Sequence, residues 1–416
     1  MSPQDEAHRR SAWRLVLLLC IAQTLVQIGA FFWPALLPQL APRWALSNSA
    51  AGWVTAAFYG AYMLAVPILV TLTDRIDPKR IYLLGVGLTV AGHLLFGLVV
   101  DGFWSALACR ALTGIGWAGT YMTGLKLLAD RVDAKMMSRA TAGHAASIGI
   151  SGALSFATGE WIARLAGWQW AFIAASLSAM VAWVIILVVV PRQEKAAAKP
   201  ADGAGLYDFR PVFRNRSAMA YAMAYAIHTL EMSALRGWGV AFLAYVAAST
   251  GTKDAVISPA VLVTMLGLIG TVASILGNEA AIKFGRRTLV QTAMLGSIVL
   301  GATIGFVGTA SYTLAAALIL LYGLIIWLDS SSLTAGTAGT AEPSRRGATL
   351  AVHSSLGYAG GFIGPLLIGG ILDLSGGMSR AGWGLSFAAV SVLMLAALLA
   401  FWWIRPREVA GDRGAT

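Results

Sequence analysis

The sequence predicts an all-α membrane protein with twelve transmembrane helices in two six-helix halves. Three observations predict this fold class. Of the 416 residues, 58% are apolar and only 12% are charged, about half the charged share of an ordinary soluble domain. Apolar stretches of about 20 residues, long enough to cross a hydrocarbon core of about 30 Å, recur along the whole chain. Finally, the basic residues lie almost entirely on one side of the topology that these stretches define.

Twelve stretches satisfy the length requirement, and the chain left over suffices only for loops. The first follows a group of arginines, as a signal peptide would. Because it continues past Trp33 with no suitable cleavage site, we expect a retained helix. The eleventh is rich in glycine, which suits either a bending gate or ordinary close packing. The predicted spans are residues 14–37, 52–73, 81–100, 103–125, 141–162, 170–190, 217–246, 257–279, 288–309, 312–338, 349–372 and 383–404.

The charge distribution predicts how these spans are oriented. With the N-terminus in the cytoplasm, 24 of the 30 Lys and Arg residues lie on the cytoplasmic side and 4 lie outside. The positive-inside rule then predicts a multi-pass protein of a bacterial-type inner membrane, with both termini cytoplasmic. The net charge of +11 faces lipid headgroups from short separate loops, which argues against a nucleic-acid partner. The 2 cysteines have no spacing typical of disulfide or metal frameworks.

A polar segment at residues 191–216 divides the chain into an N-terminal bundle, residues 1–190, and a C-terminal bundle, residues 217–416. Its Ala, Lys, Pro and Gly content is typical of a cytoplasmic linker between domains. The halves also share short patterns, such as Ala-Gly-Trp at 166–168 and again at 381–383. Two copies of a six-helix unit are typical of secondary transporters, in which a site between the copies opens alternately to each side.

Four features together resemble the major facilitator superfamily over essentially the whole chain. They are the loop containing Asp74 and Arg75, a matching basic loop around Arg286, the Arg110-x-x-x-Gly-x-Gly pattern of the fourth span, and the central linker. The resemblance implies the twelve-helix fold of that superfamily and a secondary transporter that works as a monomer. It also implies that the first, fourth, seventh and tenth helices line a central cavity.

The two loops depart from the superfamily pattern. Val70 and Asp77 stand at two glycine positions of the first loop, and Ile282 and Lys283 replace the Asp-Arg pair of the second. The inner-gate charge network that the resemblance implies is therefore expected in the first half alone, with Asp74 pairing near Arg131 or the eleventh helix. The expected gating residues are Asp74, Arg75, Lys79, Arg80, Arg131, Arg286 and Arg287.

Ionisable side chains inside the spans are few. Each costs at least about 2.5 kcal/mol at mid-membrane, so each calls for a functional or structural reason. Five such residues lie in helices that the resemblance assigns to the cavity, and two amides one turn apart join them from the first span. These candidates for substrate binding and proton coupling are Glu231, Arg236, His228, Arg110, Asp329, Gln23 and Gln27.

Glu231 lies near the middle of the seventh span, where loss of hydration suits a carboxyl to take up and release protons. His228, one turn earlier, is placed to share that proton. Arg236 is about 140° round the helix from Glu231, so a direct pair requires local unwinding near Gly237 and Gly239. The alternative reading of these residues is a polar cluster that only fixes helix packing.

The roles of Arg110 and Asp329 stay open at the level of sequence. Arg110 either holds an anionic substrate or neutralises an acid such as Glu231. Asp329 is a second coupling carboxylate, a cytoplasmic gate group, or a hydrated residue at the inner mouth. It precedes three serines, so its helix is polar on that side.

The most consistent function is proton-coupled uptake of an anionic or zwitterionic small organic solute, with no cofactor. Proton antiport of a hydrophobic drug or metabolite is the first alternative, favoured by aromatic residues such as Phe31 and Trp117. Cu(I) import is a weaker one, based on two pairs at helical spacing, Met219 with Met223 and His228 with Met232, and on Cys20 and Cys109. The missing phosphate-binding loop argues against an ATP-driven pump. No catalytic constellation suggests an enzyme, and no loop is long enough for a signalling sensor.

Overall fold

The structure, a computed structural model, describes residues 3–73, 75–132, 134–192, 209–252 and 257–414, and every regular element in this part of the chain is a helix. The all-α prediction is confirmed. Contacts within the chain divide it into two compact units. Unit 1 comprises Met1–Leu36 and Gly60–Pro200, and unit 2 comprises Leu37–Tyr59 and Ala201–Thr416.

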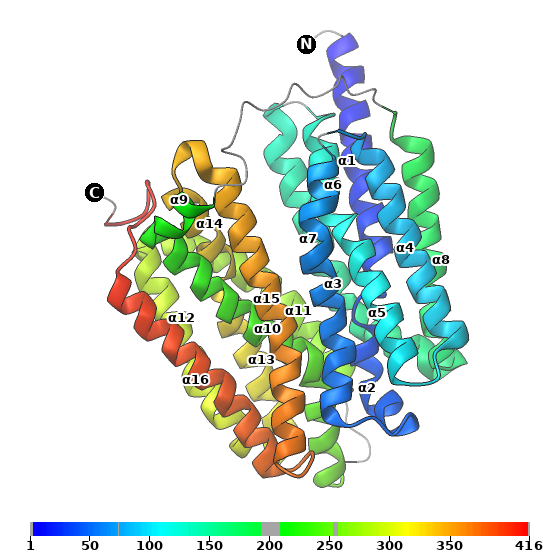
Figure 1. Cartoon of the computed structure of the whole chain (residues 1–416), viewed down its shortest axis with the longest axis vertical. Coiled ribbons are helices and arrows are strands. Elements are labelled where there is room, and N and C mark those ends of the chain that lie inside the picture. The colour runs from blue at the N-terminus through cyan, green and yellow to red at the C-terminus, as the bar shows by residue number, and fades with distance from the viewer. Residues whose placement is uncertain (1–2, 74, 133, 193–208, 253–256, 415–416) are drawn as a thin grey trace. The chain divides into compact units, whose positions relative to one another are not determined.

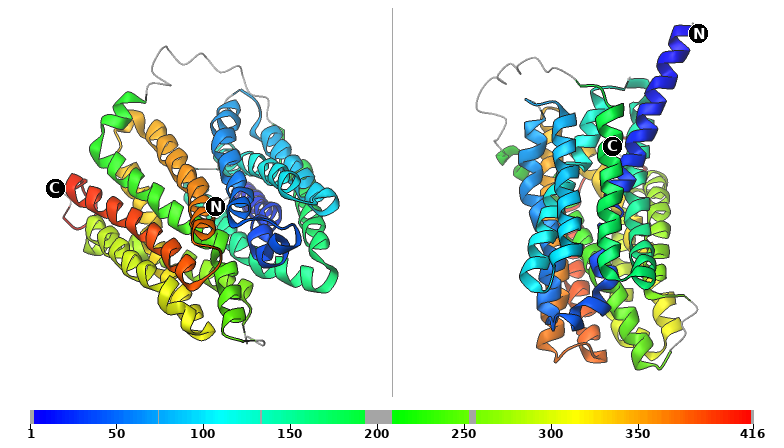
Figure 2. Two further views of the ribbon diagram at one scale, coloured as in Figure 1. Left: turned by 60° about the horizontal axis from the view of Figure 1, so that its bottom comes forward. Right: turned by 90° about the vertical axis from the view of Figure 1, so that its right-hand side faces the viewer.

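Unit 1 contains most of the first eight helices, drawn in blue to green in Figure 1. The first turns of α1 extend beyond the ends of the neighbouring helices (Figure 2). Helix α3 begins in unit 2 and continues into unit 1. The helices are α1 (Pro3–Gln27), α2 (Phe32–Arg43), α3 (Asn48–Leu72), α4 (Pro78–Val99), α5 (Phe103–Ala118), α6 (Tyr121–Ala129), α7 (Ala134–Ala166) and α8 (Trp168–Val189).

Unit 2 contains the remaining helices together with the end of α2 and the start of α3. There Asp373, near the end of α15, accepts hydrogen bonds from the backbone N–H groups of Asn48 and Ser49, at 3.0 and 2.7 Å. Two short 3₁₀ turns, Gly308–Ala310 and Pro343–Arg345, accompany the α-helices. These are α9 (Arg210–Arg214), α10 (Arg216–Ser249), α11 (Pro259–Phe284), α12 (Arg286–Val307), α13 (Tyr312–Leu328), α14 (Ser330–Thr340), α15 (Arg346–Leu374) and α16 (Arg380–Ile404).

The predicted spans recur as helices. Nine segments of the described residues are long and apolar enough to cross a membrane, and they coincide with nine of the twelve predicted spans. The other three predicted spans coincide with α5 and α6 together, with α7 and with α10. Two of these helices contain polar or charged residues among their apolar ones. Polar residues lower the hydropathy of α7, and α10 contains the charged residues Arg216, Glu231 and Arg236.

Three predicted spans each consist of two helices with an interruption between them, which hydropathy did not predict. The interruptions lie between Gln27 and Phe32, between Ala118 and Tyr121, and at Asp329. Each break leaves backbone groups that need new partners inside the membrane. In transporters, irregular backbone of this kind is tolerated where protein or a cavity surrounds it.

Short polar residues set several helix ends. Asp77 accepts a hydrogen bond from the N–H of Lys79 and precedes Pro78, the first residue of α4. Asn215 begins α10 in the same way. Because a side-chain oxygen satisfies an otherwise unpaired N–H group, each cap contributes about 1 kcal/mol. Gly285, with φ of +97°, separates α11 from α12.

Glycine allows the closest helix contacts in each unit. In unit 1, a Cβ atom on Gly85 of α4 would lie only 2.7 Å from the carbonyl oxygen of Gly116 on α5. In unit 2, Gly360 and Gly364 of α15 face the carbonyl groups of Ala226 and Leu230 on α10, too close for any side chain. The glycine-rich eleventh span therefore permits close approach to α10, while α15 stays one continuous helix.

Candidate functional site

Glu231 is buried inside unit 2, with only 1% of its surface exposed. Its Oε1 accepts hydrogen bonds from the hydroxyl of Tyr322 on α13, at 2.5 Å, and from that of Ser297 on α12. Its Oε2 has no hydrogen-bond partner in the described part of the chain. One carboxylate oxygen is thus held in place while the other stays available for a proton or a ligand.

His228 and Asp329, predicted separately as candidates, come together in unit 2. The Nδ1 atom of His228 lies 3.0 Å from Oδ1 of Asp329, and both side chains are almost fully buried. Asp329 occupies the junction between α13 and α14, so this contact joins α10 to the interruption of the tenth span. Both groups are also electrostatic neighbours of Glu231. The predicted group of titratable residues around Glu231 therefore includes Asp329.

A second histidine, which sequence reasoning missed, extends this group. His353 on α15 contacts the hydroxyls of Thr337 and Thr334 on α14, at 3.0 and 3.2 Å. The ring of Tyr225 stacks on His353, with centroids 4.0 Å apart, and also on His228, at 5.7 Å. The only available signal was a histidine near the start of an apolar span, which hydropathy treats as a helix end.

Arg236 has aromatic neighbours and no ion pair with Glu231 or Asp329 among the described residues. Its guanidinium carbon is 4.9 Å from the ring centroid of Trp327 on α13, and its electrostatic neighbours are the tyrosines Tyr59, Tyr225 and Tyr358. Helix α10 stays continuous through Gly237 and Gly239, so the local unwinding required for a pair with Glu231 does not occur. The result is a half-buried cation surrounded by aromatic side chains that carry hydroxyl groups.

Gln23 and Gln27 occupy unit 1. Gln23 accepts a hydrogen bond from the hydroxyl of Tyr82 on α4, at 2.8 Å, and is fully buried. Gln27, the last residue of α1, accepts one from Ser151 on α7, at 3.5 Å. Both amides therefore bind neighbouring helices of their own unit next to the interruption of the first span.

Arg110 also contacts that interruption. Its guanidinium donates to the carbonyl oxygen of Ala30, at 2.9 Å, and Ser155 accepts from the N–H of Phe31. His93 is a further electrostatic neighbour of Arg110. A buried arginine and a serine thus provide partners for backbone groups that the helix break leaves without them.

The loop before α4 is organised around Asp77 rather than a glycine. Arg131, just after α6, donates to the Asp77 carboxylate at 2.9 Å and to the carbonyl oxygen of Pro191 at 3.1 Å. Both charged side chains of this pair are about 95% buried. Asp74 lies outside the described residues, so its pairing with Arg131 stays a prediction.

The basic residues of this loop separate into buried and exposed ones. Lys79 is 5% exposed, and its ammonium group donates to the carbonyl oxygens of Leu187 and Val190 at the end of α8. A cation at that position complements the negative end of the helix dipole. Arg75 and Arg80 are exposed.

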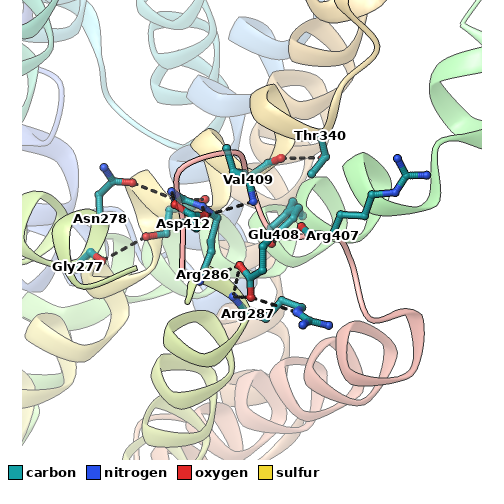
Figure 3. A network of polar contacts seen from close by, with 12 residues as sticks. Gly277, Asn278, Arg286, Arg287, Thr340, Arg407, Glu408, Val409 and Asp412 are labelled. Atoms are coloured by element: carbon teal, nitrogen blue, oxygen red, sulfur yellow. Dashed lines mark hydrogen bonds and ion pairs between the residues drawn. The ribbon is translucent and has the colours of Figure 1, made fainter. Parts of the chain in front are cut away.

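The second loop, which precedes α12, has acidic partners. The loop sequence itself did not predict them. Figure 3 shows Arg286 inside a network formed with the segment that follows α16. Its Nε and Nη2 atoms donate to the two carboxylate oxygens of Asp412, at 2.8 and 3.0 Å. Its Nη1 donates to Asn278 on α11 and to the carbonyl oxygen of Ser332 on α14. One buried guanidinium therefore joins two helices to the C-terminal segment.

Glu408 completes this network. It accepts hydrogen bonds from the backbone N–H groups of Arg286 and Arg287, the first two residues of α12, and from Nε of Arg287 at 3.1 Å (Figure 3). Arg407 contacts Ser217 and Tyr221 at the start of α10. The segment after α16 therefore contacts several helix ends of unit 2.

The family model described as "Major Facilitator Superfamily" matches residues 18–327. The chain belongs to this superfamily. It is 24% identical over 394 residues to the "Uncharacterized MFS-type transporter YbcL" of Bacillus subtilis (strain 168), covering 94% of this chain and 96% of that protein. It is also 24% identical over 398 residues to the "Sphingosine-1-phosphate transporter SPNS2" of Xenopus tropicalis, and this match covers 90% of this chain and 76% of that protein.

A solved member shares the fold. The crystal structure of a bacterial homolog to the human lysosomal transporter Spinster, in an inward-facing and occupied conformation, matches with a TM-score of 0.78 at 16% identity. The match covers 94% of this chain and 96% of that one. The twelve-helix fold of the superfamily and the assignment as a multi-pass membrane transporter rather than an enzyme are thereby confirmed.

In this superfamily member, each unit gathers its own set of the predicted residues. Unit 2 brings together His228, Glu231 and Asp329 and places Arg236 over Trp327, while unit 1 holds Arg110 and the two glutamines. Of the residues considered for Cu(I), Met223 is 49% exposed whereas His228 is buried. Within the described ranges, no group of three His, Cys, Asp or Glu residues is arranged to hold a metal ion.

Proposed function

We propose that this transporter takes up a small anionic or zwitterionic organic solute together with protons. It works as a monomer in the inner membrane, with both termini in the cytoplasm. The halves at residues 1–190 and 217–416, joined by the 191–216 linker, rock to expose the solute alternately to each side. Arg236 binds the anionic group of the solute, and Glu231 carries the proton.

The observation that carries this proposal is the separation of charges along α10. Arg236 lies over Trp327 with three tyrosines near it, whereas Glu231 is bound to Ser297 and Tyr322. The two side chains therefore have different neighbours: the guanidinium has aromatic rings that carry hydroxyl groups, and the carboxylate has two hydroxyl donors. A guanidinium beside hydroxyl-bearing aromatic rings suits a carboxylate or phosphate attached to an organic body.

The relatives support an amphiphilic solute with an anionic group. One of them is named a transporter of sphingosine-1-phosphate, a lipid that bears a phosphate. The aromatic neighbours of Arg236 suit the apolar part of such a molecule, and the guanidinium suits its charged part. For this chain we propose the class, a small organic anion or zwitterion with an apolar portion, rather than that particular lipid.

Glu231 suits proton coupling because its surroundings make a net charge costly. A charged group in the membrane interior is several kcal/mol less stable than in water, by about 2.5–3.5 kcal/mol on insertion scales. Binding a proton removes this cost, so protonation can be linked to a change in the surroundings of the carboxyl. His228 and Asp329 lie close enough to influence that step electrostatically.

Purified protein in proteoliposomes tests the proposal. A thermal-shift screen of organic anions and zwitterions first identifies a solute, and its labelled form is then offered with and without an inward proton gradient. We expect the gradient to drive accumulation, Glu231→Gln to abolish the gradient effect, and Arg236→Gln to raise the KM. Glu279→Gln, an exposed acid on α11, is the matched control. Unchanged gradient-driven uptake by the Glu231 variant would contradict the assigned role.

The same assay separates uptake from the alternative of antiport. If an outward movement of solute accompanies the proton gradient, the protein exports its solute. The aromatic residues of the first span, Phe31 and its neighbours Phe32 and Trp33, give little support to that alternative, because Phe32 and Trp33 are fully buried in the packing of unit 1. Phe31 stacks on Phe156 of α7, with centroids 5.3 Å apart.

A further inference from the structure

Exposed arginines gather at one end of unit 2, around the start of α10. Arg214 ends α9, and Arg216 begins α10 two residues later. Arg346 begins α15, and Arg407 lies in the segment after α16. All four side chains are exposed to solvent or lipid. These four residues are called the arginine patch below.

Hydrogen bonds bring segments far apart in the sequence together at this end. Asn215, which precedes the first residue of α10, donates from its side chain to the carbonyl oxygen of Thr340 on α14, at 2.9 Å. The backbone N–H of Arg407 donates to the hydroxyl of Ser217, and its carbonyl oxygen accepts from that of Tyr221, both at 3.1 Å. Arg407 is thus held beside α10 by its backbone, and Figure 3 shows its side chain extending away from the buried network.

The start of α15 lies at the same level, because α15 packs parallel to α10. Gly360 faces Ala226, and Gly364 faces Leu230, so the two helices advance together. Following both helices back to their first turns brings Arg346 level with α9, which contacts α10 and α15. Figure 1 shows α9, the start of α15 and the C-terminal segment at the same end of unit 2.

The acids near this end of unit 2 do not neutralise the patch. Within the described residues, none of the four arginines takes part in an ion pair. Asp412 and Glu408, from the C-terminal segment, are paired with Arg286 and Arg287 instead. Glu342, exposed before the start of α15, offsets one of the four charges. Because like charges repel one another, the patch favours an external anion.

An exposed aromatic side chain restricts the class of anion. Helix α9 buries Val212 and leaves Phe213, next to Arg214, 58% exposed. A dissolved anion gains nothing from that ring, whereas exposed rings beside basic residues are typical of segments that lie at a membrane surface. A guanidinium binds phosphate through two N–H groups. The combination fits a phospholipid, with its phosphate on the arginines and its acyl chains beside the ring.

We propose that the arginine patch binds the headgroup of an anionic phospholipid, with Phe213 against the first part of the acyl chains. The orientation given under the proposed function places this end of unit 2 at the cytoplasmic leaflet, and the inference rests on it in that respect. Anionic lipids of that leaflet attract basic segments that adjoin membrane helices. The bound headgroup joins α10, α15 and the C-terminal segment, whose arginines otherwise repel one another.

Native mass spectrometry of the purified full-length protein tests the proposal without any transport substrate. Equal amounts of phosphatidylglycerol and phosphatidylcholine are added to the protein in detergent, and the retained lipid is identified and counted. We expect phosphatidylglycerol to be retained in preference, because its headgroup has the net negative charge that the zwitterionic headgroup lacks. Equal retention of the two lipids would overturn the proposal.

A triple variant decides whether the lipid binds at this patch. Arg214→Gln/Arg216→Gln/Arg346→Gln removes three charges at exposed positions, where loss of the side chain disturbs no ion pair of the described residues. We expect its affinity for phosphatidylglycerol to fall roughly tenfold to a hundredfold. Its Tm in phosphatidylcholine alone should match that of the parent, which shows that the variant is folded.

The matched control removes the same number of charges from unit 1. Arg14→Gln/Arg139→Gln/Arg192→Gln changes three arginines that are also exposed, and it should retain phosphatidylglycerol as the parent does. Equal losses of affinity in the two triple variants would show a general attraction between anionic lipid and a basic protein. That result would overturn the assignment to the patch.

Phe213 and inorganic phosphate distinguish a lipid from a dissolved anion. Phe213→Ser keeps all four arginines, so a site for dissolved anions would not change, whereas retention of phosphatidylglycerol should weaken. Inorganic phosphate, compared with sodium chloride at equal ionic strength, should not displace the lipid. Unchanged retention in Phe213→Ser, or displacement by phosphate, would assign the patch to dissolved anions and overturn the proposal.

The result is separable from the fate of the proposed function. Selective retention of phosphatidylglycerol without gradient-driven uptake would preserve the lipid site and refute the coupling. Gradient-driven uptake by a protein that retains both lipids equally would preserve the coupling and refute the lipid site.

Discussion

The loop before α4 in unit 1 and the loop before α12 in unit 2 have the same position in the two halves but obtain their acidic partners differently. In the first, Asp77 lies inside the loop and binds Arg131 from the end of α6. In the second, the loop itself supplies only basic residues, and Asp412 and Glu408 come from more than 120 residues further along the chain.

The difference shows that each half satisfies its buried arginine with whatever acid its own fold brings near. A buried guanidinium without a partner is strongly destabilising, so loss of the acid from the loop must be offset elsewhere. In unit 2 the segment after α16 supplies the acidic partner that the loop lacks. This segment turns back at Arg405, a non-glycine residue with φ of +50°. The C-terminal segment is therefore part of the fold of unit 2.

Among the substitutions that test this comparison, removal of Asp412 should destabilise the protein most. Asp412→Ala leaves Arg286 buried without its bidentate partner, and we expect a loss of about 3–5 kcal/mol of folding free energy. Thermal unfolding of the purified protein, followed by loss of the monodisperse peak in size-exclusion chromatography, measures it. The double variant Arg286→Met/Asp412→Leu should recover most of the loss, since it removes both charges. A single variant as stable as the parent would mean that the C-terminal segment does not hold unit 2 together.

Substitution of Asp77 in unit 1 should cause a smaller loss of stability. This loss has two parts, one from the ion pair with Arg131 and one from the cap of α4. Asp77→Ala removes both the partner of Arg131 and the cap of α4, and we expect a loss of about 2–3 kcal/mol. Asp77→Asn keeps an oxygen for the Lys79 N–H but loses the charge, so it should recover about 1 kcal/mol of that loss. Arg131 retains the Pro191 carbonyl in both variants. Equal stability of the two variants would show that the cap contributes nothing.

The spans could be predicted from sequence because length and hydropathy determine them directly. The helix breaks could not. The interruption at 28–31 contains Gly29, which packs against His93 and Ala175, but one glycine in an apolar span is too common to indicate a break. What keeps the backbone open there is Arg110 and Ser155, from helices far along the chain.

The candidate site was predictable residue by residue but not as an arrangement. Rarity of charge in an apolar span identifies Glu231, His228, Arg236 and Asp329 without any structure. Which of them meet depends on side-chain direction across several helices. The pairing of His228 with Asp329, rather than sharing of a proton with Glu231 alone, follows from the helix break that places Asp329 opposite α10.

Lys79 tests how much the end of α8 depends on the first loop. Lys79→Met keeps the length of the buried stem but leaves the carbonyl oxygens of Leu187 and Val190 without their charged donor. We expect a loss of about 1–2 kcal/mol, measured by thermal unfolding. Arg80→Met changes an exposed neighbour and should stay within about 0.5 kcal/mol of the parent. Similar losses in both variants would show that the buried contact of Lys79 is not the source.

The smallest expected effect is at Glu408, and it distinguishes the two acids of the C-terminal segment. Its carboxylate accepts from the first N–H groups of α12, and its ion-pair partner Arg287 is 40% exposed, so solvent screens that pair. Glu408→Gln keeps an acceptor for the backbone and removes the charge, so we expect a loss of about 0.5–1 kcal/mol that shrinks in high salt. The loss in Asp412→Ala should not shrink in this way, because the Arg286 pair is buried. If salt changes both losses equally, the two contacts are alike, and the segment is attached by surface electrostatics instead of by a buried ion pair.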